Sequence, residues 1–148
     1  MILFSAAAAA SLMAEAPLQP LSALVGHCFV GPAPGNAGID RHCFESVYGG
    51  QHVRDRHVVT VGGKPVYEGE SIYSAKGRQV VFTYWNSLGG LGTGQAAIGS
   101  DDWRFTGTIH ATANSAEEPM EAEWKIVPGG YQVSEGARDK PRLFKRAD

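Results

Sequence analysis

Two segments of the chain alternate strictly between hydrophobic and polar positions. In MEAEWKI, residues 120–126, every second residue is hydrophobic and the residues between them are charged. In WRFTGTIH, residues 103–110, Trp103, Phe105 and Ile109 share one face, with Arg104 on the other. A period of two predicts β-strands with one buried face and one solvated face. Such strands are typical of antiparallel sheets and exclude a parallel sheet that helices cover on both sides.

Runs rich in Val, Ile, Thr and aromatic residues recur along the rest of the chain, each bounded by Gly, Pro, Asn or Asp. Glycine pairs at 62–63 and 129–130 suit tight hairpins, so neighbouring strands would pair antiparallel. LSALVG, residues 21–26, predicts a short helical turn before the first strand. We expect ten strands, at residues 27–31, 40–48, 52–61, 65–74, 78–86, 93–99, 102–112, 119–127, 130–136 and 141–146.

A set of about 8–10 such strands must close or fold over to protect its edges. The short connections favour an all-β, antiparallel up-and-down barrel, with a β-sandwich as the alternative. The length of 148 residues suits one domain, and 19 glycines and 8 prolines agree with many turns. A formal net charge of −2 provides no field that would attract nucleic acid, which we exclude as a partner.

The first residues form a hydrophobic segment of a different kind. MILFSAAAAASLMAEAP contains a run of small and apolar residues that has the length of a signal-peptide core and is too short to cross a bilayer. We therefore predict a signal peptide over residues 1–16 and a single barrel domain over residues 17–148. The mature chain would have no membrane span and a periplasmic or secreted location. A buried alanine-rich helix is the alternative.

The tripeptide His-Cys-Phe occurs twice, and each copy contains one of the two cysteines of the chain, Cys28 and Cys43. A hairpin centred on residues 35–36 would place the cysteines directly opposite each other, at a spacing that a disulfide accepts. A disulfide agrees with export, and two free buried thiols are the alternative. Two His-Cys pairs also suggest zinc, but adjacent side chains point to opposite faces of a strand. We therefore predict no metal site.

Four further residues are candidates for a polar site. RDRH, residues 54–57, places Asp55 and His57 on one face of a strand, as in a histidine base that a carboxylate orients. Glu70 lies on the face of its strand opposite Tyr73, and either face could point inward. Asn86 precedes a glycine-rich segment, which is either a loop that a ligand can approach or a simple hairpin. The chain has no Gly-x-Ser-x-Gly motif and no P-loop, so the sequence predicts no catalytic residue and favours a binding protein over an enzyme.

Several segments also carry a family resemblance. LSALVG is similar to the leader turn of lipocalin-like barrels, and HCFESVYGG, RDRHVV, YEGESIY and YWNSLGG resemble segments of a small family of exported bacterial proteins of unassigned function. Together, residues 21–146 resemble a calycin-type, or lipocalin-like, barrel. The resemblance implies an internal apolar cavity that can hold a small ligand, and it implies no catalytic residue.

The function that we expect is the binding of a small, largely apolar molecule inside an exported barrel. No cofactor is predicted. One alternative is a carrier of haem or another cofactor that uses His57 as a ligand. Another is a filled barrel that acts as a periplasmic interaction or stress protein through its loops. The candidates for the cavity wall are aromatic: Tyr73, Tyr84, Trp85, Trp103, Phe105, Trp124 and Tyr131.

Overall fold

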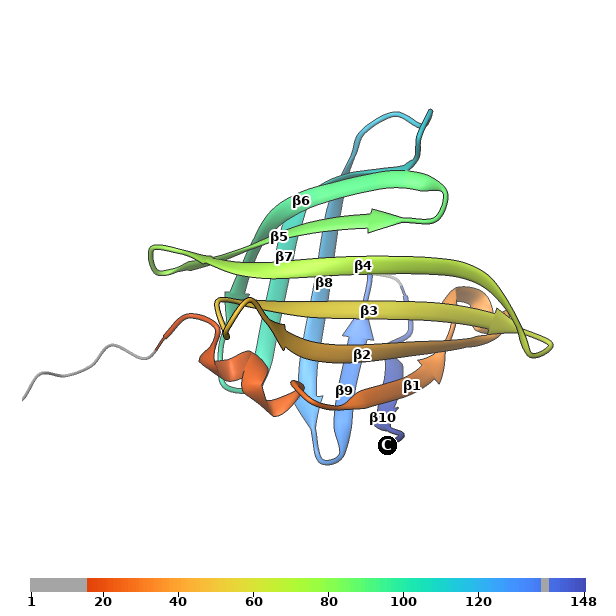
Figure 1. Ribbon diagram of the computed structural model, residues 1–148. Coiled ribbons are helices and arrows are strands. Elements are labelled where there is room, and N and C mark those ends of the chain that lie inside the picture. Colours follow the sequence, from red (N-terminus) through yellow and green to blue (C-terminus); the bar gives the residue numbers. More distant parts are fainter. Residues whose placement is uncertain (1–15, 137–138) are drawn as a thin grey trace, which may run out of the picture.

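A computed structural model of the chain describes residues 16–136 and 139–148 and contains ten strands that close into a barrel. Each strand pairs antiparallel with its neighbour in the sequence, and β1 closes the barrel against β10 (Figure 1). The predicted antiparallel up-and-down barrel is therefore confirmed. The strands are β1 (Cys28–Pro32), β2 (Ile39–Val47), β3 (His52–Val61), β4 (Lys64–Lys76), β5 (Gln79–Asn86), β6 (Gly89–Ile98), β7 (Asp102–Thr112), β8 (Glu118–Val127), β9 (Gly130–Ser134) and β10 (Arg142–Arg146).

Helical structure within the described residues is limited to two short 3-10 turns, η1 (Gln19–Ala23) and η2 (Pro34–Asn36). Neither of them has the length and hydropathy that a membrane-crossing helix needs. The predicted signal peptide over residues 1–16 lies outside the described residues except for Ala16. The strands of the first half, β2 to β4, run crosswise to β7, β8 and β9 in the second half (Figure 1).

All strands except β6 begin and end within two residues of their predicted bounds. β6 starts at Gly89, where the sequence suggested that a glycine-rich loop continues to residue 92. The glycines serve close packing instead, because a Cβ on Gly94 would lie 2.1 Å from the Thr106 carbonyl oxygen of β7. A Cβ on Gly90 would likewise lie 2.5 Å from the Ala111 carbonyl oxygen. A backbone that approaches its neighbour this closely requires glycine without requiring a loop.

Large aromatic side chains fill one half of the interior. Trp103 stacks on Trp124, Trp124 on Tyr131, and Tyr131 on Phe144, with ring centroids 4.9–6.0 Å apart. The η1 segment covers this half, and its Leu21 is fully buried. Burial of this aromatic area is the main driving force for the fold. The rest of the core comprises Leu24, Phe29, Phe44, Val53, Tyr73, Val80, Phe82, Ala96, Phe105, Ala122 and Val133.

The β1–β2 hairpin pairs Cys28 with Cys43, and the two form a disulfide with a Cα–Cα distance of 4.1 Å. The predicted disulfide is thus present. Because adjacent residues alternate, the cysteines face outward while Phe29, His42 and Phe44 face inward.

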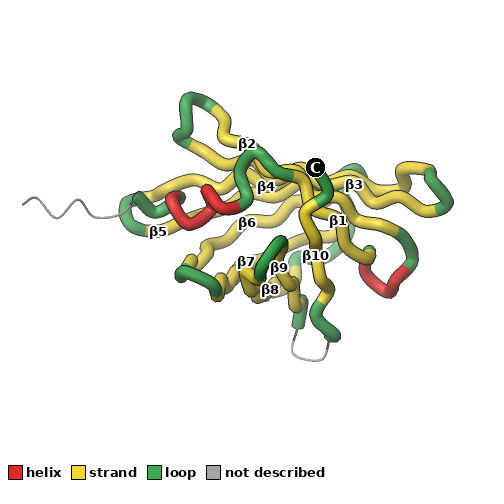
Figure 2. Tube along the Cα trace, turned by 90° about the horizontal axis from the view of Figure 1, so that it is seen from below, coloured by secondary structure: helices red, strands yellow, loops and turns green. Residues whose placement is uncertain are grey.

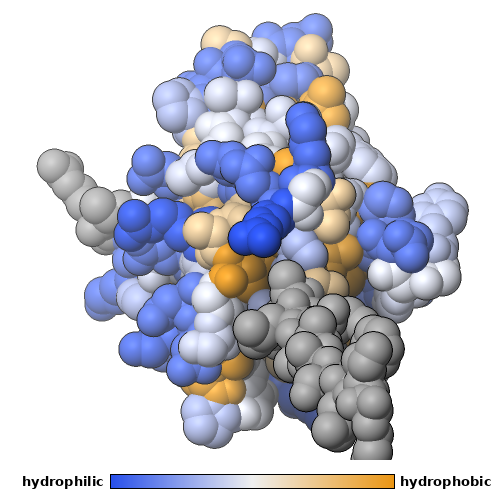
Figure 3. Space-filling view, turned by 90° about the vertical axis from the view of Figure 1, so that its left-hand side faces the viewer, coloured by the Kyte–Doolittle hydropathy of each residue, from blue (hydrophilic) through white to orange (hydrophobic). Residues whose placement is uncertain are grey.

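Polar side chains dominate the outer face of the barrel that Figure 3 shows, and its hydrophobic patches are small and separated. Seen from below, β2 to β5 lie on one side of the molecule and β7 to β9 on the other (Figure 2).

Candidate functional site

A cluster of acidic and imidazole side chains lies inside the barrel on β2 and β3. Asp40 and His42 share the inner face of β2, and Asp55 and His57 share the inner face of β3. The register of the two strands places His42 directly opposite His57. Asp40 and Asp55 are only 2% and 3% exposed, and they are the two acidic residues that are buried in the part of the chain that the structure describes. Buried carboxylates require partners, and the two histidines provide them.

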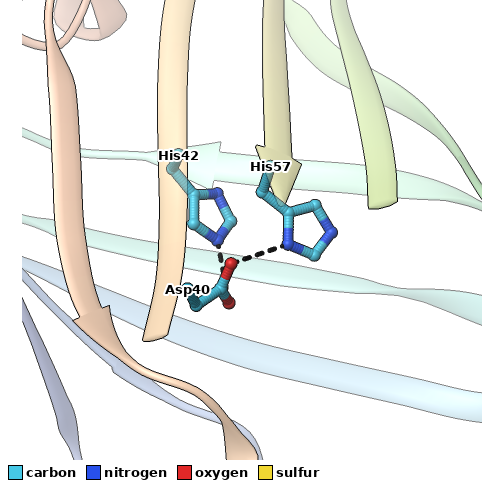
Figure 4. Close-up of side chains that lie close together, drawn as sticks. All are labelled: Asp40, His42 and His57. Carbon is cyan, nitrogen blue, oxygen red and sulfur yellow. Dashed lines mark hydrogen bonds and ion pairs between the residues drawn. The ribbon is translucent and has the colours of Figure 1, made fainter. Parts of the chain in front are cut away.

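His42 contacts both carboxylates, and His57 contacts that of Asp40. His42 donates from Nδ1 to both oxygens of Asp55, at 2.9 and 3.0 Å, and its Nε2 lies 3.3 Å from Oδ2 of Asp40. His57 donates from Nδ1 to Oδ1 of Asp40 at 3.0 Å. Both histidines thus point at Asp40 (Figure 4). Their rings stack with centroids 4.5 Å apart.

The surroundings of His42 and Asp40 favour the charged form of each side chain. Burial alone would lower the pKa of His42, but the carboxylates of Asp55 and Asp40 outweigh burial and raise it to about 10. Burial alone would raise the pKa of Asp40, but hydrogen bonds from His42 and His57 hold it below its usual range. His42 is therefore an imidazolium, and Asp40 a carboxylate, at neutral pH.

Arg142 of β10 brings a second positive charge to the cluster. Its guanidinium lies 3.5 Å from Oδ2 of Asp40 and 3.1 Å from Oε2 of Glu135, and it donates to the Pro32 carbonyl oxygen at 3.0 Å. It also lies over the ring of Phe144, 5.2 Å from the centroid. Arg142 is therefore shared between a buried acid and an acid that is exposed to solvent.

The second nitrogen of His57 faces two tyrosine hydroxyls. Its Nε2 lies 3.4 Å from the hydroxyl of Tyr84, which hydrogen-bonds the hydroxyl of Tyr67. Burial, and then the hydrogen bond with Tyr67, raise the pKa of Tyr84, so its hydroxyl stays protonated. Gly69 makes this arrangement possible, because a Cβ there would lie 2.3 Å from Nε2 of His57 and 2.6 Å from the Tyr84 hydroxyl.

On β6 and β7, the half of the interior around this cluster is lined by glycines. Its inward positions on β6 and β7 include Gly92, Gly94 and Gly107. Tyr67, Tyr84 and several apolar residues that face inward here are only partly buried, and the apolar ones include Ile109 and Met120. These inward side chains, on the side of the barrel away from η1, are therefore more exposed than those of the aromatic core.

One buried polar atom has no partner within residues 16–136 and 139–148. The hydroxyl of Tyr131 is buried and forms no hydrogen bond. Burial, followed by the negative charge of Asp55, raises its pKa. Buried hydroxyl groups in proteins almost always have a partner, such as a bound water or a ligand atom.

The predicted cavity residues divide into three groups. Tyr73, Trp103, Phe105, Trp124 and Tyr131 face inward, but they pack against one another as the hydrophobic core. Tyr84 faces inward and adjoins His57. The prediction for Trp85 is wrong, because this residue follows Tyr84 in the strand, points outward and is 40% exposed.

The predicted polar residues are only partly brought together. Asp55 and His57 both belong to the cluster, but Asp55 pairs with His42 and His57 pairs with Asp40. Glu70 lies outside the cluster, on the outer face of β4 opposite Trp85.

Asn86 lies outside the cluster as well, and it has a structural role. It stabilises the β5–β6 turn, where its Oδ1 accepts from the backbone amides of Leu88 and Gly90 at 2.9 and 3.0 Å. Its Nδ2 donates to the Ala111 carbonyl oxygen at 3.1 Å.

Sequence reasoning missed Asp40, His42, Tyr67 and Arg142 as members of the site. Asp40 and His42 carried a usable signal, because IDRHCF places them on the same face as Phe44. Arg142 carried none, since closure of the barrel brings it to Asp40 across 102 residues of sequence.

Comparison with known proteins does not add an identity to this geometry. Neither a scan against models of protein families nor a search of curated proteins returned a match. The site is therefore interpreted from its own chemistry.

Proposed function

We propose that this protein is an exported, lipocalin-like barrel that binds a small, largely apolar molecule at the end of the barrel away from η1. The observation that carries the proposal is the division of the interior. One half is filled by stacked aromatic rings, while the other is lined by glycines and holds polar groups on partly exposed side chains. Protein interiors are normally closely packed, and binding sites combine apolar walls with a few polar groups. A half of the interior that is lined by glycines and holds partly exposed polar groups therefore suits a ligand better than a purely structural role.

The polar groups indicate the chemistry of the ligand. His57 presents its Nε2 atom, and Tyr67 and Tyr84 present hydroxyl groups. The nearby apolar side chains of Ile109 and Met120 suit a hydrocarbon body. The expected ligand is therefore apolar with a single polar end, such as a hydroxyl or carbonyl group. The unpartnered hydroxyl of Tyr131 supports the presence of a further polar atom in the interior.

The disulfide supports export as part of the proposal. Disulfides form and persist in the periplasm and outside the cell, and they are rare in the reducing cytosol. The Cys28–Cys43 bond therefore agrees with a periplasmic or secreted location.

The test combines native purification with a matched pair of variants. Native mass spectrometry of the protein from periplasm should show a co-purified small molecule. In parallel, the apolar fluorophore N-phenyl-1-naphthylamine should bind the wild-type protein. Gly92→Leu places a side chain inside the barrel, and Thr93→Leu places the same side chain on its outer face.

We expect Gly92→Leu to weaken binding of the fluorophore by at least tenfold, and Thr93→Leu to leave it unchanged. Equal binding by both variants would place the fluorophore on the outer surface. The absence of both a co-purified molecule and fluorophore binding would favour a filled barrel that acts through its loops.

A second candidate function is a haem carrier, and one observation favours it. Histidines that ligate a metal commonly donate a hydrogen bond from their other ring nitrogen to a carboxylate. His57 makes such a hydrogen bond from Nδ1 to Asp40 at 3.0 Å. Titration with haem would then produce a strong absorption band in the visible range, which His57→Ala would abolish. No band in the wild-type protein removes this candidate.

A further inference from the structure

The side chains of Asp40, His42 and His57 converge on one point. One ring nitrogen of His42, one ring nitrogen of His57 and a carboxylate oxygen of Asp40 all lie within 4.8 Å of one another. We propose that these three residues bind a single divalent transition-metal ion of the zinc class. The ion would be bound by Nδ1 of His57, whereas the proposed ligand site uses the Nε2 side, which faces Tyr84.

Two of the contacts are close to the spacing that such an ion needs. Zinc binds nitrogen and carboxylate oxygen at about 2.0–2.2 Å, so two ligand atoms of a tetrahedral site lie roughly 3.3–3.5 Å apart. Oδ2 of Asp40 lies 3.3 Å from Nε2 of His42, and its Oδ1 lies 3.0 Å from Nδ1 of His57. An ion would replace the hydrogens that both imidazoles direct at Asp40. His42 would release one proton to solvent, and His57 would carry its hydrogen on Nε2.

Both imidazoles have an outer partner on the nitrogen that faces away from Asp40. Nδ1 of His42 donates to Asp55 at 2.9 Å, and Nε2 of His57 faces the hydroxyl of Tyr84 at 3.4 Å. Metal-ligating histidines in proteins almost always have such a partner, which orients the ring and strengthens the ligand. The arrangement of Asp55, His42 and the ion is the carboxylate–histidine–metal relay of known metal sites.

The charges of the cluster also match a divalent ion. The carboxylates of Asp40, Asp55 and Glu135 carry three negative charges and the guanidinium of Arg142 carries one positive charge. With both imidazoles neutral, the sum is two negative charges, which a divalent cation neutralises. The guanidinium of Arg142 would repel the ion. This repulsion is reduced because the guanidinium also interacts with Glu135 and the Pro32 carbonyl oxygen.

The cluster is accessible enough to exchange an ion. The side chains of His42 and His57 are 12% and 13% exposed, while that of Asp40 is 3% exposed. Three protein ligands leave at least one coordination position for water, as in catalytic zinc sites rather than structural ones.

The test uses the purified full chain after any affinity tag has been cleaved and bound metal has been removed with a chelator. Zinc is then titrated against a chromophoric competitor, and cobalt is titrated while its visible absorption is recorded. We expect one ion per chain and a cobalt spectrum of a four- or five-coordinate nitrogen and oxygen site. X-ray absorption at the zinc edge should show two imidazole ligands.

Matched variants separate the site from other histidines. His42→Ala should abolish stoichiometric binding, and Asp55→Asn should weaken it by about 10–100-fold, because the outer partner is lost. His27→Ala and His110→Ala should bind as tightly as the wild type, since His27 pairs with Asp148 and His110 bonds the Thr112 backbone.

Circular dichroism of each variant checks the fold. The proposal is wrong if the wild type binds zinc no more tightly than His42→Ala. It is equally wrong if X-ray absorption at the zinc edge of the wild-type protein shows no pair of imidazole ligands. This second measurement requires no substitution.

Discussion

Gly69 lies at the centre of the candidate site, and its replacement by alanine tests the geometry directly. A Cβ at this position would lie 2.3 Å from Nε2 of His57 and 2.6 Å from the Tyr84 hydroxyl. Ordinary contacts between such atoms are about 3.5 Å, so the imidazole must move by roughly 1 Å. His57 cannot move freely, because its Nδ1 is hydrogen-bonded to Asp40 at 3.0 Å.

The size of the effect follows from that hydrogen bond. A shift of about 1 Å takes the His57–Asp40 distance beyond the range of a hydrogen bond. A hydrogen bond to a charged group contributes about 1.5–3 kcal/mol, and overpacking a core typically costs about 1–3 kcal/mol. We therefore expect Gly69→Ala to lower the free energy of unfolding by about 2 kcal/mol, which lowers Tm by roughly 4–8 °C in a chain of this size.

Urea denaturation in the presence of a chelator measures this change. Gly92→Ala is the matched control, because it also adds a methyl group inside the barrel, but its Cβ would meet nothing closer than 3.3 Å. We expect the control to change the free energy of unfolding by less than about 1 kcal/mol. The reasoning is refuted if Gly69→Ala is as stable as the control and retains the zinc affinity of the wild type.

Other predictions concern the disulfide and the charges of the cluster. Replacing Cys28 and Cys43 by serine opens a loop that spans 15 residues and should lower the free energy of unfolding by about 3 kcal/mol, as measured by urea denaturation with and without reductant. Asp55→Asn should cost about 3–5 kcal/mol at pH 7, because it leaves the buried imidazolium of His42 without its main partner. Folding raises the pKa of His42 from 6.5 to about 10, so its contribution is complete below pH 6.5 and is lost as the pH rises towards 10. In metal-free protein, stability should therefore fall by about 1.4 kcal/mol per pH unit across this window, and a flat profile would show that His42 is not charged in the folded state.

Local patterns along the chain were sufficient for the strands and their pairing. Alternation of hydrophobic and polar residues depends only on the two-residue period of a strand, and glycine turns reverse the chain within a few residues. The Cys28–Cys43 bond was predictable for the same reason, because both cysteines belong to one hairpin. Asp55 and His57 could also be placed on one face, since they are two residues apart.

The tertiary structure decided which face points inward where both faces carry large side chains, as in β4 and β5, and which charges meet inside the barrel. Alternation shows that Tyr84 and Trp85 point in opposite directions, but only closure of the barrel shows that Tyr84 is the inner one. The partners in the cluster depend on the register between strands and on closure, which brings Arg142 to Asp40. These contacts join residues far apart in the sequence, and their energies come from burial and charge pairing, which no local pattern encodes.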